Sequence, residues 1–280
     1  MAFSKLDPNQ VSDYQKKGFV LVPGMFDPEE IALLGKSARE DRTLDQHSFG
    51  RADGAGGSVR LALWNHPGQG IYGMFARCER VVRSMELLLG GEVYHYHSKM
   101  IMKDAKVGGA WTWHQDYGYW YQNGCLFPHM ASLFIAVDPC TRENGCLQVI
   151  SGSHDCGRMD HTLTGDQAGA DMERVQELLT RLPLEFVEMA PGDGLFFHGN
   201  LLHRSDQNRS DHPRWSMICC YNAASNNPYK ESHHPRYTPL EVVPDASIRE
   251  VGIKRFGDDT TAVGWLEDTD DQSARILSKD

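Results

Sequence analysis

The spacing of hydrophobic positions changes about a third of the way along the chain, near residue 90. From there onward the sequence is a series of short apolar runs, separated by turn dipeptides such as Asn144-Gly145 and Gly192-Asp193. Short runs bounded by Gly, Asn and Asp are typical of β-strands and their connections. The predicted strands cover residues 93–103, 109–114, 131–138, 146–150, 184–189, 194–198 and 214–222.

The chain before residue 90 has a different pattern. Residues 18–23 predict one strand, and residues 81–89 have the apolar spacing of a helix. Asp27, Pro28 and Glu30 form a helix start, with an N-cap, a proline at the first position and a capping-box acceptor at the third. One further helix is predicted within the strand-rich part, over residues 171–182.

Many short strands at even spacing favour a jelly roll or barrel. We therefore predict a mainly β fold with flanking helices, a double-stranded β-helix of the jelly-roll or cupin-like type. We expect a single domain over residues 1–280, with an N-terminal flank of about 1–90, a core of about 91–225 and a C-terminal extension of about 226–280.

Two segments carry separate expectations. Residues 49–58 are rich in glycine, and we expect a mobile loop there that closes over a site when ligand binds. The chain after Gly257 is acidic, and we expect it to be a solvated helix or disordered.

The composition excludes several classes of protein. The net charge of −10 argues against a nucleic-acid surface, which needs clustered Lys and Arg. No apolar run approaches the length of a membrane span, and the N-terminus lacks the apolar stretch of a secretory signal. The seven cysteines form no Cys-x-x-Cys pair, so neither a disulfide framework nor a zinc site is indicated. We expect a cytoplasmic protein.

The candidate chemistry lies in four residues. His114 and Asp116 stand two apart in Trp113-His114-Gln115-Asp116, and His203 follows much later. Two imidazoles and one carboxylate are the facial triad of non-haem Fe(II) oxygenases, which leaves coordination positions open. Residues two apart on a strand share a face, so we expect both ligands of the first pair to point into the barrel, with His203 arriving from the opposing sheet. Arg214 offers a cation suited to a dicarboxylate.

Several sequence blocks around these residues occur in the order found in one family. The chain resembles the phytanoyl-CoA dioxygenase family of Fe(II)/2-oxoglutarate-dependent oxygenases over most of its length. The blocks are Gly18–Gly24 with Asp27–Glu30, Trp113–Asp116, Glu143–Leu147, Ile150–His154, Pro191–Asp193 and His198–Ser205.

The resemblance implies a role for each of these residues. His114, Asp116 and His203 would hold Fe(II), while Ser205 and Arg214, two and eleven residues after the second His, would bind 2-oxoglutarate. Phe134 would pack against the cosubstrate, and Lys99 would lie beside it. The implied reaction uses O2 and 2-oxoglutarate, releases succinate and CO2, and hydroxylates an unactivated C–H bond. Halogenases of the family lack the carboxylate ligand, so Asp116 favours hydroxylation.

The pattern is closest to that of the ectoine-hydroxylase-like members, but it departs from them where they contact substrate. Lys99 stands where that group carries Arg, and residues 121–125 lack its His and acidic residues after the Trp. We therefore expect another small polar or zwitterionic metabolite. The candidate substrate residues are Arg60, His97, Tyr117 and Trp120, with Lys99 and Lys103 as further cations for an acidic group.

Alternatives remain at the level of residues and of function. His95-x-His97 is a rival metal pair, His198 is interpreted as a core histidine, and His233-His234 as solvated. Rival functions are a catalytically idle binding protein on the same fold, an acyl-CoA hydroxylase, and a zinc-bound or cofactor-independent cupin.

Overall fold

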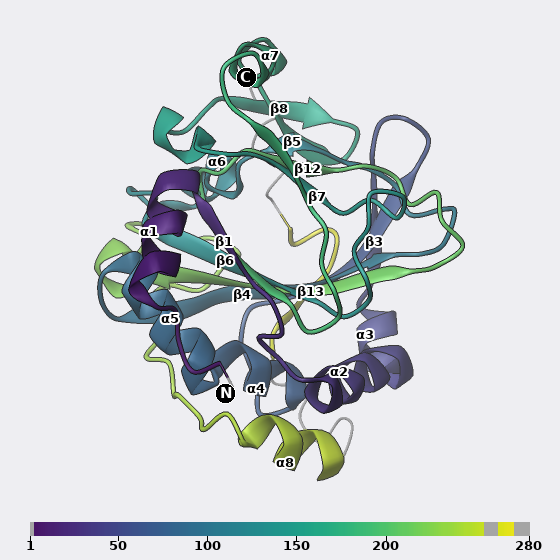
Figure 1. The fold of residues 1–280 in the computed structure, drawn as a ribbon, viewed down its shortest axis with the longest axis vertical. Coiled ribbons are helices and arrows are strands. Elements are labelled where there is room, and N and C mark those ends of the chain that lie inside the picture. The colour runs from purple at the N-terminus through teal and green to yellow at the C-terminus, as the bar shows by residue number, and fades with distance from the viewer. Residues whose placement is uncertain (1–2, 255–262, 272–280) are drawn as a thin grey trace.

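The computed structural model describes residues 3–254 and 263–271. Within these ranges two β-sheets face each other, with helices against the outer face of the larger one (Figure 1). The large sheet has the strand order β1-β11-β6-β13-β4-β3-β14, with β2 paired to β3, and the small sheet has the order β10-β7-β12-β5. This arrangement confirms the predicted class, mainly β with flanking helices.

The strands that build the two sheets match most of the predicted runs. The large sheet contains β1 (Phe19–Val22), β2 (Phe49–Ala52), β3 (Ser58–Trp64), β4 (Val93–Lys103), β6 (Met130–Ala136), β11 (Gly194–His198), β13 (Arg214–Ala223) and β14 (Trp265–Leu266). The small sheet contains β5 (Trp111–His114), β7 (Leu147–Ile150), β10 (Leu184–Val187) and β12 (His203–Ser205). A separate hairpin pairs β8 (His161–Thr164) with β9 (Gln167–Ala170).

Helix α2 (Pro28–Glu40) begins as its sequence predicts. The Asp27 side chain accepts from the backbone N–H groups of Glu29 and Glu30, and the Glu30 side chain accepts from the N–H of Asp27. The other helices are α1 (Pro8–Lys17), α3 (Arg42–Gln46), α4 (Ile71–Arg77), α5 (Glu79–Leu89), α6 (Asp116–Trp120), α7 (Met172–Leu179) and α8 (Ser247–Lys254). Short 3₁₀ turns cover Tyr121–Asn123, Ser153–Cys156 and Ala224–Asn226.

The central strand β4 contributes side chains to two hydrophobic clusters, and a register shift against β13 between Cys220 and Tyr221 interrupts the alternation along the strand. Met100 and Met102 join the cluster that includes residues of α2, α4 and α5. Ile101, Tyr94 and Tyr96 join the cluster that includes residues of both sheets, on the other side. The candidate residues His114, Asp116 and His203 lie on this second side, between the sheets.

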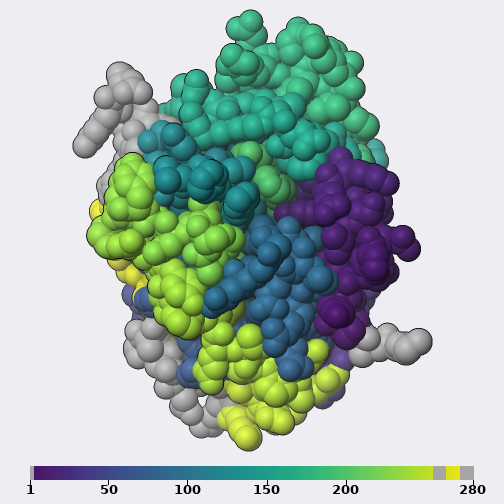
Figure 2. All heavy atoms as spheres, turned by 90° about the vertical axis from the view of Figure 1, so that its left-hand side faces the viewer, coloured from purple at the N-terminus to yellow at the C-terminus, as the bar shows by residue number. Residues whose placement is uncertain are grey.

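The chain after β13 returns to the N-terminal half. Figure 2 shows it, in yellow-green, on the same face as α1 and the blue segment around α5. Contacts join these parts, because the Tyr237 hydroxyl donates to Glu92 at 2.6 Å and Val243 forms a bridge with Cys78. No helix among the described residues has the length and apolar character needed to cross a membrane.

Two expectations for connecting segments were wrong. The 49–58 segment is not a continuous loop, because residues 49–52 form β2 and pair with β3, which leaves a connection of residues 53–57. In the acidic C-terminal tail, residues 258–262 and 272–280 lie outside the described residues. The described part contains β14, which pairs with β3 at Trp64 and Leu63 through Trp265 and Leu266, so it is neither a helix nor disordered.

Candidate iron and 2-oxoglutarate site

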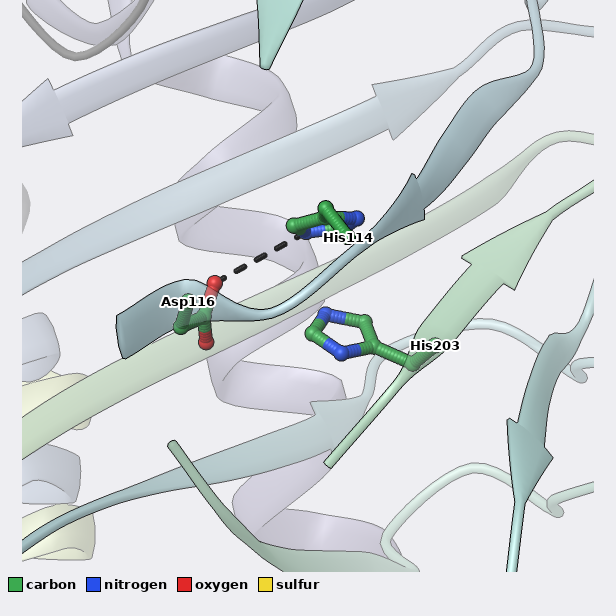
Figure 3. Close-up of side chains that lie close together, drawn as sticks. All are labelled: His114, Asp116 and His203. Atoms are coloured by element: carbon green, nitrogen blue, oxygen red, sulfur yellow. Dashed lines mark ion pairs between the residues drawn. The ribbon is translucent and has the colours of Figure 1, made fainter. Parts of the chain in front are cut away.

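His114, Asp116 and His203 meet between the sheets, as Figure 3 shows. One possible ligand atom from each residue lies within 4.8 Å of the others, and no other group of three or more such residues occurs in the described part of the chain. The imidazole centroids of the two histidines are 4.1 Å apart. His114 Nε2 lies 3.7 Å from Asp116 Oδ1. All three residues are buried, which limits competition from water.

The backbone orients both imidazoles for metal binding. His114 Nδ1 lies 2.8 Å from the carbonyl of Thr112, and His203 Nδ1 lies 2.9 Å from the carbonyl of Leu201. A carbonyl oxygen only accepts, so Nδ1 must carry the proton in each ring and Nε2 keeps its lone pair. Burial lowers the pKa of both imidazoles, which favours the neutral form that a metal requires.

The carboxylate is held by two hydroxyl groups. The Ser132 hydroxyl, from β6, donates to Asp116 Oδ2 at 3.2 Å. The Tyr119 hydroxyl, one turn along α6, donates to Asp116 Oδ1 at 3.4 Å. These contacts fix the side chain, as expected for a metal ligand that must keep one geometry. The three residues therefore fit the ferrous ion that their types indicate.

The local structure of the triad differs from the expected one in two respects. His114 ends strand β5, but Asp116 is the first residue of helix α6, so the two ligands do not share a strand. Gln115 between them is extended, with φ −113° and ψ 133°, which preserves the side-chain alternation up to the turn. His203 lies directly opposite His114 on the neighbouring strand of the same sheet, so the expectation of an opposing sheet was wrong.

A cavity that contains Arg214 adjoins the triad. Arg214, the first residue of β13, is 1% exposed, its Nη1 donates to Ser216 Oγ at 3.4 Å, and its guanidinium lies 5.6 Å from the Phe134 ring centroid. Arg214 Nε has no hydrogen-bond partner among the described residues. The lining comprises Lys99, Ile101, Lys103, Trp111, His114, Phe134, Leu147, His203, Arg204, Ser205, Arg214 and Ile218.

Lys103 adds a second cation to this cavity. Its ammonium group donates to the carbonyl of Asp206, and the side chain is fully buried. Burial, with a further contribution from the charge of Arg214, lowers the pKa of Lys103. In the sequence Lys103 was only a candidate for an acidic group on the substrate. Lys99, Ile101 and Lys103 alternate along one strand, and this period-two spacing was the signal that they share a face.

A second cavity lies on the other side of His114 and shares Lys99 and Trp111 with the first. Its lining comprises Arg51, Leu61, Leu63, His97, Lys99, Trp111, His114, Tyr119, Asp166, Gln167, Ala168, His234 and Asp271. His114 lines both cavities, so each of them contacts the triad.

The structure brings only some of the candidate substrate residues to this cavity. His97 and Lys99 line it, whereas Arg60, Tyr117 and Trp120 do not. Arg60 pairs with Asp45 at 2.9 Å and with Asp104 at 3.4 Å. Tyr117 and Trp120 are buried in the hydrophobic cluster between the sheets.

Residues that sequence reasoning missed take their place. Tyr119 belongs to the dense aromatic run 111–121, but nothing in that run singled it out. His234 is 3% exposed and stacks on His97, so the interpretation of the His233-His234 pair as solvated was wrong. Asp271 reaches the site from the far end of the described chain, which no local pattern could reveal.

The other histidines have structural partners. His95 contacts the Asn65 carbonyl at 3.2 Å and Ser98 Oγ at 2.7 Å, and it belongs to no metal-binding group among the described residues. His198 accepts from the Asn200 N–H and lies against the rings of Tyr14 and His154, in agreement with its interpretation as a packed core residue.

Comparison with known proteins agrees with this geometry. The chain is 28% identical over 250 residues to L-proline trans-4-hydroxylase of Streptomyces griseoviridis, covering 84% of this chain and 91% of that protein. It is 28% identical over 257 residues to ectoine dioxygenase of Halomonas elongata, covering 84% and 77%.

Solved structures share the fold. The structure of EctD from S. alaskensis with bound Fe matches with a TM-score of 0.72 at 24% identity, covering 86% of this chain and 89% of that one. The structure of the same protein with 2-oxoglutarate and 5-hydroxyectoine matches with a TM-score of 0.68. The family model for phytanoyl-CoA dioxygenase matches residues 14–216, which contain all three triad residues and Arg214. The chain therefore belongs to the phytanoyl-CoA dioxygenase family.

Proposed function

We propose that the protein is an Fe(II)- and 2-oxoglutarate-dependent dioxygenase that hydroxylates an unactivated C–H bond of a small polar metabolite. The observation that carries this proposal is the convergence of His114, Asp116 and His203 within 4.8 Å, beside a cavity that contains the buried Arg214. When bound, the iron with O2 and 2-oxoglutarate supplies the oxidising chemistry, with succinate and CO2 as products.

The chain's own contribution begins with the metal ligands. His114 Nε2, His203 Nε2 and a carboxylate oxygen of Asp116 would hold Fe(II) and leave positions open for cosubstrate and O2. Hydrogen bonds from Ser132 and Tyr119 keep the carboxylate in place. Because each imidazole Nδ1 donates a hydrogen bond to a backbone carbonyl, neither ring can flip without losing that bond.

Arg214 would bind the distal carboxylate of 2-oxoglutarate. Its planar guanidinium offers a fork of donors, and a buried charge gains most from a charged partner. Ser205 lines the same cavity and would add a hydroxyl donor, while the ring of Phe134 would pack against the cosubstrate. Lys99 and Lys103 lie on one face of β4 in this cavity, and we assign both to the carboxylate groups of 2-oxoglutarate.

A small polar substrate agrees with the second cavity. His97, Lys99, Gln167 and Asp271 give its lining polar and charged groups, and its free space of about 50 Å³ suits a compact molecule better than an acyl-CoA. The curated relatives are named for L-proline and ectoine, two small polar metabolites. We also propose a reducing, cytoplasmic setting, which the seven free cysteines support.

Succinate release under air tests the proposal. Purified protein with Fe(II) and 2-oxoglutarate should produce succinate, and one member of a panel of amino acids, betaines, aminophosphonates, ectoine and acyl-CoAs should raise the rate. Iron binding without succinate under any condition would instead support the catalytically idle binding protein. Succinate raised only by the acyl-CoAs would support the acyl-CoA hydroxylase.

A further inference from the structure

Two residues of the second cavity lie beyond the part of the chain that the family model matches. That match ends at residue 216, and the proposed iron and cosubstrate residues precede this point. His234 and Asp271 follow it and yet line the cavity together with His114. The residues proposed to bind iron and cosubstrate therefore lie within the matched part of the chain, whereas one wall of the second cavity is formed by residues beyond it.

Residues 263–271, which we name the C-terminal strap, are held in place by several contacts. Arg51 of β2 pairs with Asp268 and, at 2.9 Å, with Asp271. Asp271 Oδ1 lies 3.6 Å from His233 Nε2. The Trp265 ring stacks on His47, with centroids 5.2 Å apart and an interplanar angle of 4°.

Arg51 is the central contact of the strap. Its side chain is 9% exposed, as is typical of a cation that relies on charged partners, and its ion pairs with Asp268 and Asp271 both reach the strap. Arg51 also lines the second cavity. Loss of its charge would leave two carboxylates without their shared cation and weaken the strap without altering the triad.

His97 is the polar group that this wall faces. It is 1% exposed and lies on β4, and neither ring nitrogen has a hydrogen-bond partner among the described residues. Its ring stacks on His234 at 4.4 Å with an interplanar angle of 15°, while His234 Nδ1 contacts Asn65 Oδ1 at 2.8 Å. Buried polar groups normally have partners, so an unpartnered imidazole in a cavity wall indicates a position where a ligand supplies one.

The wall of the second cavity combines strands of the sheets with the strap. The strands are fixed by their ladders of hydrogen bonds. The strap is held by side-chain contacts and a few backbone hydrogen bonds, and its two-residue strand is the shortest in the large sheet as described. Its position can therefore change more readily than that of the strands when a ligand enters.

We propose that the C-terminal strap and His234 form the substrate-side wall of the active site and determine which substrate fits. His97 and His234, with Asp271, bind the polar group of a small metabolite, and docking of the strap on Arg51 closes the cavity over it. This inference rests on the proposed function, and it identifies the part of the chain that selects the substrate.

Chemical modification tests the closure without any need for activity. Diethyl pyrocarbonate modifies accessible imidazoles, and peptide mass spectrometry reads His97 and His234 separately in the full chain, with and without Fe(II) and 2-oxoglutarate. We expect both to react slowly in the natural protein and about tenfold faster in Arg51→Met, because a broken buried ion pair favours local opening. Equal rates in the two proteins would overturn the proposal.

Two further variants keep this test decisive. Arg181→Met serves as the matched control, because Arg181 is exposed and its ion pair with Glu177 lies within its own segment, so modification rates should not change. Asp271→Asn removes the carboxylate charge that Arg51 pairs with but keeps the Arg51–Asp268 pair, so it should accelerate modification by a smaller factor, even if Arg51→Met fails to fold. No acceleration in Asp271→Asn, with Arg51→Met unfolded, would also overturn the proposal.

Kinetics with L-proline and ectoine as probes separate substrate selection from cosubstrate binding. For the probe that stimulates succinate release, His234→Gln and Asp271→Asn should change kcat/KM by about tenfold, as expected when buried hydrogen bonds to a substrate are lost. The KM for 2-oxoglutarate should stay unchanged. An equal change in kcat/KM for the probe and in the KM for 2-oxoglutarate would overturn the proposal. If no succinate forms in any protein, the proposed function fails, while the modification rates still decide whether the strap closes the cavity.

Discussion

Each imidazole of the triad is oriented by a carbonyl two residues earlier in its own chain segment, that of Thr112 for His114 and that of Leu201 for His203. Spacing in the sequence identified the three candidate ligands and Arg214, because a ligand set and its cation form a recognisable pattern. It could not identify Tyr119, His234 or Asp271, since a tyrosine, a histidine and an aspartate are common on surfaces and only folding brings them to the site.

Replacing Asp116 by Ala should abolish iron-dependent succinate release. The change removes the anionic ligand and leaves two neutral imidazoles, which bind Fe(II) more weakly. Metal content after dialysis and succinate formation measure the effect. Asp155→Ala is a matched control, because Asp155 is exposed and lies outside both cavities. Full turnover in Asp116→Ala would contradict the assignment of the triad.

Replacing Arg214 by Ala should raise the KM for 2-oxoglutarate by tenfold or more. A charge-assisted hydrogen-bonded pair contributes about 1.5–3 kcal/mol, and this loss falls on cosubstrate binding. Arg214→Lys keeps the charge but loses the planar fork, so its KM for 2-oxoglutarate should lie between those of the natural protein and Arg214→Ala. An unchanged KM for 2-oxoglutarate in a folded Arg214→Ala protein would rule out the proposed role.

At the scale of elements, the junction between β5 and α6 determines the spacing of the first two ligands. The N–H of Gln115 donates to His161 Nε2 at 2.9 Å, and His161 Nδ1 donates to the Met159 carbonyl at 2.9 Å. This histidine therefore connects the junction to the neighbouring hairpin. The predicted strand ended at residue 114, as β5 does, but His114 and Asp116 were expected to share a strand face, because a helix of five residues has too little periodicity to detect.

Gly118 in α6 lies directly against the His161 ring, where a Cβ would overlap the imidazole. Gly118→Ala should therefore push α6 and the junction apart and destabilise the protein by about 1–3 kcal/mol, the usual cost of overpacking. Urea unfolding measures the loss of stability, and iron titration should detect weaker metal binding. Gly70→Ala is the control, because a Cβ there meets nothing within 4 Å. Equal stability of the two variants would refute this account.

The elements that were predicted correctly share a strong hydrophobic pattern. Strand β4 was predicted over residues 93–103, its observed extent, and helix α2 was located by its capping box. The elements that were missed include the β8–β9 hairpin and β14, which are short and partly polar, and their pairing depends on distant partners. Local pattern is weakest where tertiary contacts decide the conformation.

At the scale of the whole molecule, the large sheet separates two hydrophobic clusters that join different elements. One cluster joins the sheet to the helices on its outer face, and the other lies between the sheets, around the proposed site. The fold also largely buries several histidines that bind no metal in our proposal. Protonation of these imidazoles makes the stability of the fold depend on pH.

Stability should decrease as the pH falls below about 6.5. Burial lowers the pKa of His95 to about 3 and that of His161 and His198 to about 4, from the usual value of 6.5. Between these pKa values and 6.5 the unfolded chain binds more protons than the folded one. The free energy of unfolding therefore decreases as the pH decreases, by up to ~1.4 kcal/mol per pH unit for each group. Above pH 6.5 all three are neutral in both states and contribute no slope.

Urea unfolding at pH 7.5, 6.0 and 5.0 measures this dependence, with a decreasing midpoint expected at each step. His198→Gln should make the decrease shallower, because it removes one of the three buried groups and lies outside both cavities of the site. If the midpoint falls as steeply with decreasing pH in His198→Gln as in the natural protein, acid acts through groups other than His198, and this account is wrong.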